Sequence, residues 1–517
     1  MTARKLKKSF DSHRLDNLGV SIKHLVSDSR QIVPGDTFLA YVGEKFDARK
    51  FIPQAIAAGA NAVLWEKQNF SWDPAWKLPA LPVTGLKEAA GFIASHVYGN
   101  PSRKLWLIGI TGTNGKTSCS HWIAQAMAAL NNKTAIIGTL GNGFPDKLES
   151  TTNTTPDAVL LQQEMVMFLN QGADAVAMEV SSHGIEQGRI NGSTFAVAVL
   201  TNLSRDHLDY HGSMDAYATA KEKLFFWPGL KHAVLNLDDV FGVEISRQLV
   251  NKETQVIGYG FRQPEVDSRS SESIRTVRGS NLKITIQGLG FDVEFEGNQA
   301  QVKAGLMGRF NASNLLAVLA TLLISGYKFS DAVEAIQQVR PLPGRMEKFG
   351  GEALPVVIVD YAHTPDALEK VLITLREILR DSPDKPGAET KNARLFCVFG
   401  CGGERDSGKR RISGEVVTRL ADKAIITNDN PRSEKPREII DEIVAGAESR
   451  KNFSIEEDRG AAIYRAICDA RKGDIVLIAG KGHESYQEMD GNKLPFSDCG
   501  VVQQVLQQLS TKARKQG

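Results

Sequence analysis

The 517-residue sequence predicts an α/β protein of three domains, in which a central P-loop domain with a parallel sheet is followed by a Rossmann-like α/β domain. Apolar runs of strand length alternate with helical segments in two separate sets, and one strand leads directly into a glycine-rich turn and a helix start. Proline and glycine interrupt this alternation at Asn100-Pro101 and at 339–346. We therefore expect domains at 1–100, 101–340 and 341–517.

Residues 1–100 predict a small α/β unit without a catalytic cluster. Strands are expected on both sides of the Pro34-Gly35 turn, and a helix leading to a strand is expected at 51–66. Residues 27–30 read Ser-Asp-Ser-Arg beside an apolar strand. This segment is either a solvated turn or a loop that contacts a ligand.

The central domain begins with the strongest motif of the chain, LWLIGITGTNGKTSCS at 105–120. An apolar strand at 105–110 precedes small residues, whose backbone N–H groups can surround phosphate oxygens at a helix N-terminus. Lys116 can reach the β- and γ-phosphates, and the Thr117 hydroxyl suits Mg²⁺. Ile110 occupies a position where the general P-loop pattern has glycine, so an ordinary glycine-containing turn is the alternative. The residues predicted to bind the nucleotide are Gly112, Thr113, Asn114, Gly115, Lys116, Thr117 and Ser118.

Polar residues follow further strands expected at 175–180, 196–200 and 233–237. Such continuous apolar runs are typical of a parallel sheet covered on both faces, where ligands gather at the carboxyl ends of the strands. Glu179 is therefore well placed to hold Mg²⁺, and His207, between two aspartates, is a candidate for metal or phosphate contact. A solvent-facing or structural role is the alternative for each. Residues 261–280 predict a peripheral polar loop or hairpin.

The last domain has strands expected at 355–360, 395–399, 424–427 and 475–479, each followed by a polar loop. Four such loops at successive strand ends favour one shared pocket over four unrelated surface loops. The pocket would combine the cations of Arg405, Arg432 and Lys481 with the carboxylates of Asp429 and Glu484. Such a mixture suits a zwitterionic ligand.

Composition excludes several classes of protein. The formal charge of +2 gives no global signal for nucleic acid, and no segment is apolar for long enough to span a membrane. The basic N-terminal stretch lacks the apolar run of a secretory signal. The five cysteines form no CxxC pair, which favours a reducing cytoplasm over a disulfide framework or a zinc site. We expect a cytoplasmic monomer with no nucleic-acid partner.

Taken together and in order, ten motifs resemble those of the Mur ligases of bacterial cell-wall synthesis. They are TGTNGKTS, NTTPD, MEVSSHG, NLSRDHLDYHG, GRFN, LPGRME, DYAHTPD, GCGGERDSGKR, DNPR and AGKGHE. The resemblance runs from about Ser27 to about Gln487, and that family also uses GTNGKT in place of the strict P-loop pattern. GTNGKT alone would fit folylpolyglutamate synthases as well.

The resemblance implies roles that the residues alone do not. It implies binding of ATP and Mg²⁺, with further ATP contacts at Asn311, Arg345 and Asp360. It implies metal ligation by Glu179, His207 and Lys221, the last matching a lysine that is carbamylated in the family and can then hold a second Mg²⁺. For a UDP-N-acetylmuramoyl-dipeptide, it implies contacts with the UDP end at Ser27, Ser29, Glu44, Lys45 and Phe46. It implies contacts with the muramoyl-dipeptide at Asn153, Thr154, Thr155, Ser181, Gln187 and Arg189.

The resemblance also implies an amino-acid pocket formed by Arg405, Asp429, Asn430, Pro431, Arg432, Gly480 and Glu484. Family members that use meso-diaminopimelate carry DNPR, whereas users of L-lysine depart from its arginine. The guanidinium of Arg432 suits the extra carboxylate of diaminopimelate. Glu404 replaces the aspartate of relatives, a change that we expect to be tolerated. The implied reaction joins the diamine to D-glutamate through an acyl phosphate.

Three alternatives remain at this point. The L-lysine-adding ligase and a folate-type polyglutamylating ligase would use the same ATP apparatus. A non-catalytic nucleotide-binding switch would need no amino-acid pocket.

Overall fold

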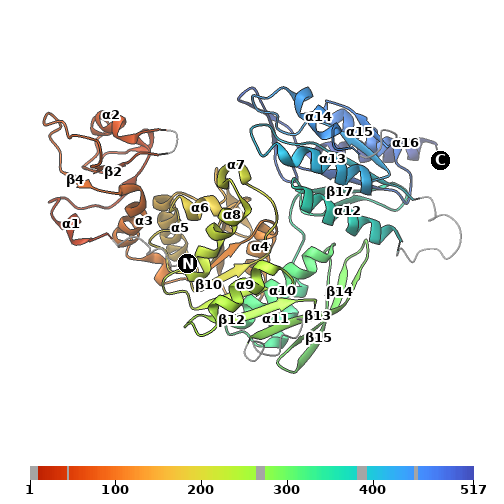
Figure 1. Ribbon diagram of the computed structural model, residues 1–517, viewed down its shortest axis with the longest axis horizontal. Helices are drawn as coiled ribbons and strands as arrows, with labels where there is room; N and C mark the ends of the chain where they lie inside the picture. The colour runs from red at the N-terminus through yellow and green to blue at the C-terminus, as the bar shows by residue number, and fades with distance from the viewer. Residues whose placement is uncertain (1–9, 44–45, 263–273, 381–392, 448–451, 517) are drawn as a thin grey trace.

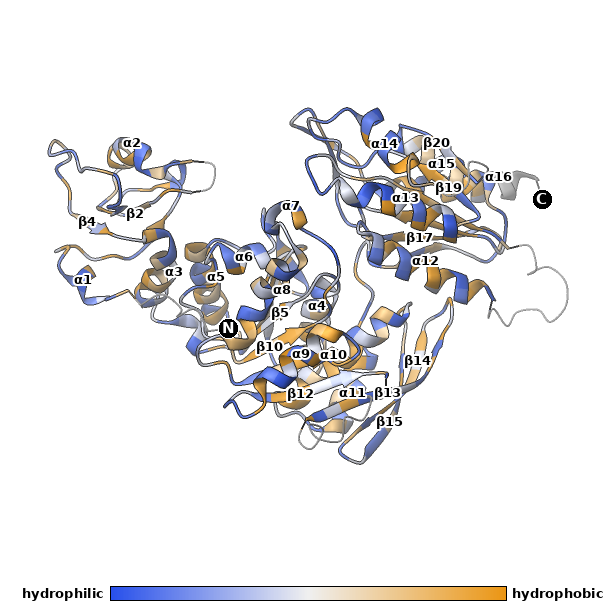
Figure 2. Ribbon diagram, viewed as in Figure 1, coloured by the Kyte–Doolittle hydropathy of each residue, from blue (hydrophilic) through white to orange (hydrophobic). Residues whose placement is uncertain are grey.

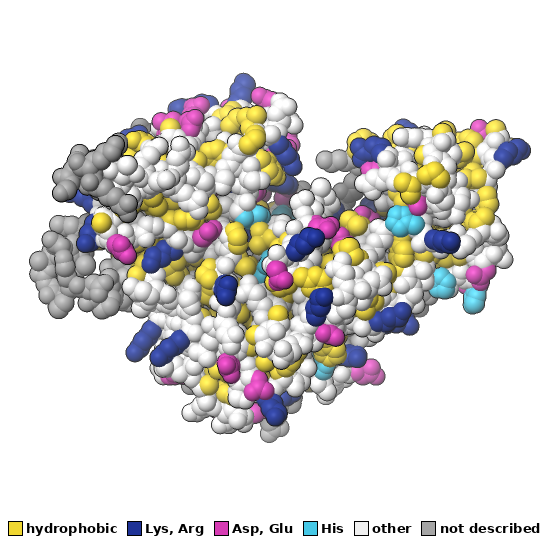
Figure 3. Space-filling view, turned by 180° about the vertical axis from the view of Figure 1, so that it is seen from behind, with side chains coloured by type: hydrophobic (Ala, Val, Ile, Leu, Met, Phe, Trp, Pro, Cys, Tyr) yellow, Lys and Arg dark blue, Asp and Glu magenta, His cyan; other side chains and the backbone are white. Residues whose placement is uncertain are grey.

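The structure, a computed structural model, describes residues 10–43, 46–262, 274–380, 393–447 and 452–516. Three regions, each with its own main sheet, follow one another along the chain, and the central region lies between the outer two (Figure 1). Seen from behind, the surface is hollowed between the two outer regions (Figure 3). No helix in the described ranges is long and apolar enough to cross a lipid bilayer.

The amino-terminal sheet is parallel, with the order β1-β2-β3-β4. Its elements are α1 (His13–Asp16), β1 (Leu25–Val26), β2 (Thr37–Ala40), α2 (Ile52–Ala57), β3 (Ala62–Glu66), β4 (Ala80–Val83) and α3 (Leu86–Val97). This region packs closely on the central one. A Cβ atom added to Gly192 would lie 2.2 Å from the Gly91 carbonyl oxygen, and Gln163 Nε2 donates to the Leu25 carbonyl at 2.9 Å.

The central sheet has eleven strands in the order β15-β14-β13-β12-β11-β10-β5-β9-β6-β7-β8. They are β5 (Trp106–Thr111), β6 (Thr134–Gly138), β7 (Gly141–Phe144), β8 (Lys147–Glu149), β9 (Ala175–Glu179), β10 (Val197–Leu200), β11 (His232–Asn236), β12 (Gln255–Gly260), β13 (Arg275–Ile284), β14 (Leu289–Phe295) and β15 (Asn298–Ala304). Neighbours from β6 to β13 pair in parallel, whereas β7, β8, β14 and β15 add antiparallel margins.

Helices that accompany the central sheet are α4 (Lys116–Ala129), α5 (Ala158–Asn170), α6 (Ser182–Glu186), α7 (Leu208–His211), α8 (Met214–Glu222), α9 (Val240–Leu249), α10 (Arg309–Ile324) and α11 (Phe329–Gln337). Helix α10 is apolar on nearly all sides and buried, packed between α4 and the strands. A helix of this kind is stable only inside a core. It therefore fixes α4, and with it the phosphate-loop motif, against the sheet.

The carboxyl-terminal sheet has the order β16-β17-β21-β18-β19-β20, with only β16 antiparallel to its neighbour. Its strands are β16 (Glu347–Gly350), β17 (Val356–Asp360), β18 (Leu395–Phe399), β19 (Lys423–Ile426), β20 (Phe453–Ile455) and β21 (Ile475–Ala479), and a hairpin of β22 (Tyr486–Met489) and β23 (Asn492–Pro495) follows. Helices α12 (Pro365–Arg380), α13 (Gly408–Leu420) and α14 (Pro436–Val444) cover one face, and α15 (Arg459–Asp469) and α16 (Asp498–Gln516) cover the other.

Hydropathy agrees with this layering. Strands β10 and β17 are largely orange in Figure 2, and α12 carries both apolar and polar residues, as expected for a helix with one buried face. The prediction of an α/β fold with parallel sheets is confirmed by this topology.

Of the two alternatives for 261–280, the polar loop is wrong from Arg275 onward, and the structure has the hairpin there, formed by β13 and β14. From Arg275 the chain forms β13, which pairs with β12 on one side and β14 on the other. Only alternate residues such as Val277 and Gly279 are buried, so the polar residues between them conceal the strand. Residues 263–273 lie outside the described ranges.

Candidate active site

The phosphate-loop motif forms a tight turn between β5 and α4. Gly112 and Gly115 have φ angles of +144° and +86°, and a Cβ atom on Gly112 would lie 1.9 Å from Thr201 Oγ1. The loop is tied to the end of β10, because Thr201 Oγ1 donates to the Asn114 carbonyl at 2.6 Å and Asn114 N donates to Asn202 Oδ1 at 3.0 Å. Only glycine fits both the space and the backbone conformation at Gly112.

A half-buried lysine and a buried lysine converge on one carbonyl of this loop. Lys116 Nζ donates to the carbonyl oxygens of Gly112 and Thr113 at 2.8 and 2.9 Å, and Lys221 Nζ donates to Gly112 at 2.9 Å. Burial lowers the pKa of both amines, that of Lys221 well below its ordinary value, and the charge of Lys116 lowers it further. Tyr217 covers Lys221 with its ring, 4.4 Å from Nζ. The loop thus brings two amine donors to the place where phosphate oxygens would bind.

Glu179 lies beside the start of α4. The Thr117 hydroxyl donates to its Oε2 at 3.0 Å, and the backbone N–H of Thr139 donates to its Oε1 at 2.8 Å. A Cβ atom on Gly138 would come within 2.3 Å of Oε1, so the glycine leaves room for the carboxylate. Hydroxyl and carboxylate oxygens are ligands that suit Mg²⁺. Among the described residues, no three His, Cys, Asp or Glu side chains gather into a metal site.

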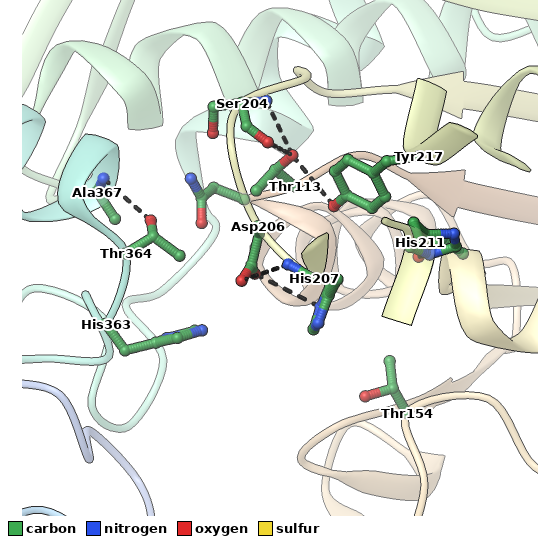
Figure 4. A network of polar contacts seen from close by, with 12 residues as sticks. Thr113, Thr154, Ser204, Asp206, His207, His211, Tyr217, His363, Thr364 and Ala367 are labelled. Carbon is green, nitrogen blue, oxygen red and sulfur yellow. Dashed lines mark hydrogen bonds and ion pairs between the residues drawn. The ribbon is translucent and has the colours of Figure 1, made fainter. Parts of the chain in front are cut away.

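His207 occupies the opposite side of the loop. Its backbone N–H donates to Asp206 Oδ1 at 2.9 Å, and its ring stacks edge-on against His183 with 4.8 Å between centroids. Burial lowers the pKa of His207 to about 3 despite the Asp206 carboxylate, so the ring is neutral at pH 7, the form that can ligate a metal. Figure 4 shows Asp206 and His207 near Thr113, with His363 of the carboxyl-terminal region facing them.

Five of the six residues predicted near the dipeptide form one network. Thr155 Oγ1 donates to the Glu179 carbonyl at 2.9 Å and accepts from Ser181 N at 3.0 Å. Arg189 Nη1 donates to the Thr155 carbonyl at 2.8 Å, and its Nε donates to Gln187 Oε1 at 2.7 Å.

The network also reaches the side chain of Glu179. The hydroxyls of Thr154 and Thr139 share a hydrogen bond of 3.0 Å, and Thr139 also contacts Glu179. Asn153, in contrast, is exposed and bonds only to neighbours in its own turn among the described residues. The network is therefore linked to Thr117 of the phosphate loop through Glu179.

The amino-terminal residues lie across from this network. Ser27 is hydrogen-bonded to Tyr41. Burial raises the pKa of Tyr41 to about 12, and the nearby charge of Arg189 in the central region opposes this rise. Ser29 is buried, and its hydroxyl donates to Gln54 Oε1 at 3.2 Å. Phe46 is 73% exposed, whereas Glu44 and Lys45 lie outside the described residues.

A cleft that is open to solvent lies between the phosphate loop and the carboxyl-terminal region. Of the residues predicted to bind ATP, it is lined by Asn114, Gly115, Ser118, Asn311, Arg345 and Asp360. Arg345 lies over the Tyr361 ring at 4.4 Å and donates from Nη2 to Thr117 Oγ1 at 3.2 Å. Asp360 accepts from Met346 N at 2.8 Å, and burial raises its pKa.

The loops after β17, β18, β19 and β21 meet at one edge of the carboxyl-terminal sheet, as the sequence predicts. The fully buried Lys481 donates from Nζ to Asn430 Oδ1 at 2.9 Å and to Glu484 Oε2 at 2.7 Å. Gly480 N donates to the Asp360 carbonyl at 3.1 Å, and a Cβ atom on Gly480 would lie 2.5 Å from Asp429 Oδ2. The carboxylates of Asp429 and Glu484 and the amide of Asn430 therefore lie around the Gly480-Lys481 segment.

Arg432 joins the remaining loop to this group. Its Nη1 donates to the Gly403 carbonyl at 2.6 Å and its Nε lies 3.3 Å from Glu488 Oε2, while Nη2 has no protein partner among the described residues. Gly403 also packs on the carbonyl of Pro431. Arg405 faces the central region closely enough to add to the effect of burial in lowering the pKa of His183.

The sequence did not single out several residues of the site. Thr139 follows β6, whose apolar run at 134–138 could have indicated a strand end. Tyr217 carries no sequence signal, because only the tertiary fold brings it to Lys221. Phe310, which lines the cleft, lies within the GRFN motif but had no assigned role. Tyr361 lies within a noticed motif but without an assigned role.

The fold and the site define a three-domain α/β protein with a phosphate-binding loop that faces a polar pocket on each outer domain. Family models match 21–98 (Mur ligase family, catalytic domain), 110–322 (Mur ligase middle domain) and 344–482 (Mur ligase, glutamate ligase domain). The chain belongs to the Mur ligase family, and the resemblance of its motifs is confirmed.

Individual relatives agree with this. The chain is 60% identical, over 96% of its length and 95% of the relative's, to a UDP-N-acetylmuramoyl-L-alanyl-D-glutamate--2,6-diaminopimelate ligase of Nitrosomonas europaea. A solved structure of a ligase with the same name has a TM-score of 0.65, is 33% identical and covers 95% of both chains. The fold is also shared with a MurF ligase from Thermotoga maritima in complex with ADP, which is 17% identical, has a TM-score of 0.63 and covers 96% of this chain and 99% of that one.

Proposed function

We propose that this protein uses ATP to join meso-2,6-diaminopimelate to the γ-carboxylate of D-glutamate in UDP-N-acetylmuramoyl-L-alanyl-D-glutamate, a step of peptidoglycan precursor synthesis. The observation that supports this best is the DNPR loop at 429–432, whose guanidinium is held by the Gly403 carbonyl and Glu488, in a chain 60% identical to a ligase named for these substrates. An L-lysine-adding ligase would not need this arginine, because L-lysine has no distal carboxylate for it to bind. A folate-type ligase has no use for the amino-terminal domain, which matches a Mur ligase model.

Chemically, the γ-carboxylate is too poor an electrophile to react with an amine. In the proposed reaction, a carboxylate oxygen attacks the terminal phosphorus of ATP, ADP leaves, and an acyl phosphate forms. The amine nitrogen of the diamine then attacks the acyl carbon, phosphate leaves with the C–O bond electrons, and the amine proton goes to solvent. No side chain of the protein needs to become a covalent nucleophile.

The phosphate loop would stabilise the transferred phosphoryl group. Lys116 already lies with its ammonium among the loop carbonyls, from which it can turn to phosphate oxygens. Thr117 and Glu179 fit a Mg²⁺ ion, and when bound the ion would neutralise phosphate charge. Arg345 at the start of the carboxyl-terminal domain adds a cation to the same hydroxyl, so domain position and phosphate binding are linked.

Lys221 fits the proposed carbamate for a physical reason. Its lowered pKa favours the neutral amine, whose lone pair can attack the carbon of CO₂ with loss of a proton. The resulting anion would lie close to the Lys116 ammonium, because both side chains reach the Gly112 carbonyl, and the two charges would attract each other. With His207 it could then hold a second Mg²⁺.

In the proposed diamine pocket, Arg432 would bind the distal carboxylate, and Asp429 and Glu484 would bind the ammonium group beside it. The unshared Nη2 of Arg432 leaves a donor for this purpose. Arg405, near His183, would lie on the side where the diamine meets the acceptor.

Release of phosphate from ATP in the presence of the UDP-dipeptide tests the proposal, with diaminopimelate, L-lysine and ornithine compared. We expect release that depends strictly on diaminopimelate, and a mass increase of the nucleotide product by one diaminopimelate residue. Equal use of L-lysine would favour the lysine-adding ligase, folate-dependent release a folate-type ligase, and release without any amine a nucleotide switch. We also propose that the enzyme acts as a cytoplasmic monomer, which sedimentation and fractionation of cells can check.

A further inference from the structure

A buried ion pair lies behind the proposed diamine pocket, formed by Arg459 and Asp498. Both side chains are fully shielded from solvent, with Arg459 Nε 2.8 Å from Asp498 Oδ1 and Nη2 2.7 Å from Oδ2. Arg459 begins α15 and Asp498 begins α16, and these helices pack side by side on one face of the sheet (Figure 1). Such a two-pronged contact fixes the guanidinium plane in one orientation.

The same guanidinium holds the ends of two strands. Nη2 donates to the Ala479 carbonyl at 2.9 Å, and Nη1 donates to the Asn428 carbonyl at 3.3 Å. Ala479 ends β21, and Asn428 lies two residues beyond β19. The next residues in the chain are Gly480 and Asp429, which form the proposed pocket. One buried cation therefore sets the exit direction of both pocket loops.

The charges around Arg459 also link it to the pocket. Asp429 and Glu484 both stabilise the charged form of Arg459, as does its partner Asp498, against the cost of burial. A Cβ atom on Gly480 would lie 3.8 Å from Arg459 Nη2 and 2.5 Å from Asp429 Oδ2. Gly480 thus separates the guanidinium from the carboxylate by little more than its own backbone.

We propose that Arg459, held by Asp498, is a positioning residue that aligns Asp429 and Gly480 for binding of the diamine. It reaches the substrate only through these two residues. Its positive charge also attracts the carboxylates of Asp429 and Glu484 from behind the pocket, which holds these two side chains in place. The inference rests on the proposed function of this pocket and adds a residue that none of the sequence motifs contains.

A matched pair at the other end of the same sheet provides the control. Arg394 Nη2 lies 2.8 Å from Asp474 Oδ2, and these residues precede β18 and β21 at their amino ends, away from the pocket. Both pairs join strand β21 to a neighbouring element through an arginine and an aspartate. Only the Arg459 pair contacts the carbonyls that lead into the pocket.

Steady-state kinetics of the full-length enzyme test the proposal with two variants. Arg459→Lys keeps the charge but loses the planar fork, and the double variant Arg459→Met with Asp498→Leu removes both charges at once. Replacing both partners of a buried pair by apolar residues is often tolerated, whereas removing one partner leaves an unpaired charge. Circular dichroism and thermal unfolding establish which variants fold, and Arg459→Lys decides the question if the double variant does not.

We expect the KM for diaminopimelate to rise about tenfold or more in each folded variant, because small displacements of binding groups have effects of this size. The KM values for ATP and for the UDP-dipeptide should stay within about twofold of wild type. The control Arg394→Met with Asp474→Leu should leave all three KM values unchanged within the same limit.

Two outcomes overturn the proposal: an unchanged KM for diaminopimelate in a folded Arg459 variant, or an equal rise of all three KM values. Either would assign the pair to stability alone. Failure of the proposed function is distinct, since wild-type enzyme would then release no phosphate in response to diaminopimelate.

Discussion

The guanidinium of Arg432 offers the sharpest test of substrate choice. Replacement by lysine keeps a positive charge but removes the planar pair of donors that matches a carboxylate. In the structure Nη1 is already engaged with the Gly403 carbonyl and Nε lies near Glu488, so the guanidinium is held with Nη2 available. Its side chain is 19% exposed, so a bound carboxylate would be largely shielded from water.

The size of the effect follows from that geometry. A hydrogen bond to a charged group contributes about 1.5–3 kcal/mol, which corresponds to a loss of roughly 10- to 150-fold in kcat/KM for diaminopimelate. L-Lysine lacks the distal carboxylate, so its kcat/KM should change little. Discrimination between the two amino acids should therefore fall by nearly the same factor in Arg432→Lys.

The assay is phosphate release with each amino acid varied at saturating ATP and UDP-dipeptide. Glu488→Gln is the matched control, because it removes the ion-pair partner and leaves the guanidinium in place. It should retain the preference for diaminopimelate. Equal losses for diaminopimelate and L-lysine in Arg432→Lys, or a raised KM for ATP, would refute the assignment of this pocket.

Three further predictions follow from buried groups of the central domain. Lys221→Ala should abolish turnover, with partial rescue by short carboxylic acids that replace the carbamate anion; full activity without them would remove that role. Gly138→Ala would bring a Cβ atom within 2.3 Å of Glu179 Oε1, so overpacking of about 1–3 kcal/mol should raise the Mg²⁺ concentration for half-maximal activity roughly 5- to 150-fold, and an unchanged Mg²⁺ titration would count against the metal assignment. Burial lowers the pKa of His121 to about 4, so the unfolded chain binds more protons between pH 6.5 and 4 and stability falls as pH drops through this range. Compared with His121→Gln, the wild type should lose about 3 kcal/mol more unfolding free energy between pH 7 and 4, measured by denaturant titration followed by tryptophan fluorescence; parallel pH curves would contradict this.

Much of the architecture could be predicted, because strands of a parallel sheet covered on both faces have continuous apolar runs in the sequence. The run at 395–399 and that at 475–479 are strands with the expected bounds. Parallel pairing then places their carboxyl ends at one edge, so the polar loops after them had to meet. The convergence of Asn430, Lys481 and Glu484 is a consequence of this rule.

Other features could not be predicted, because tertiary contacts decide them. Lys221 lies in a short, polar helix and is indistinguishable there from a surface lysine, yet it is buried beneath the phosphate loop. Strand β13 is half polar, so its alternation was hidden among loop residues until pairing with β12 and β14 revealed it. Arg459 stands at a helix start where an arginine is usually solvated, and only the packing of α15 on α16 buries it.

Glu179 shows how the fold brings the proposed reactants together. Its side-chain oxygens accept hydrogen bonds from Thr117 on the nucleotide side and from Thr139, while its own backbone carbonyl accepts from Thr155 on the dipeptide side. The same residue therefore fixes both the hydroxyl proposed to hold Mg²⁺ and the network proposed to hold the acceptor carboxylate. A displacement of the β9 end would move phosphate and acceptor together, which preserves their separation. Transfer of the phosphoryl group depends on that separation far more steeply than binding of either reactant does. Attachment of both proposed sites to one strand end therefore keeps the two reactants in register, whereas the third reactant, the diamine, would be carried on a separate domain.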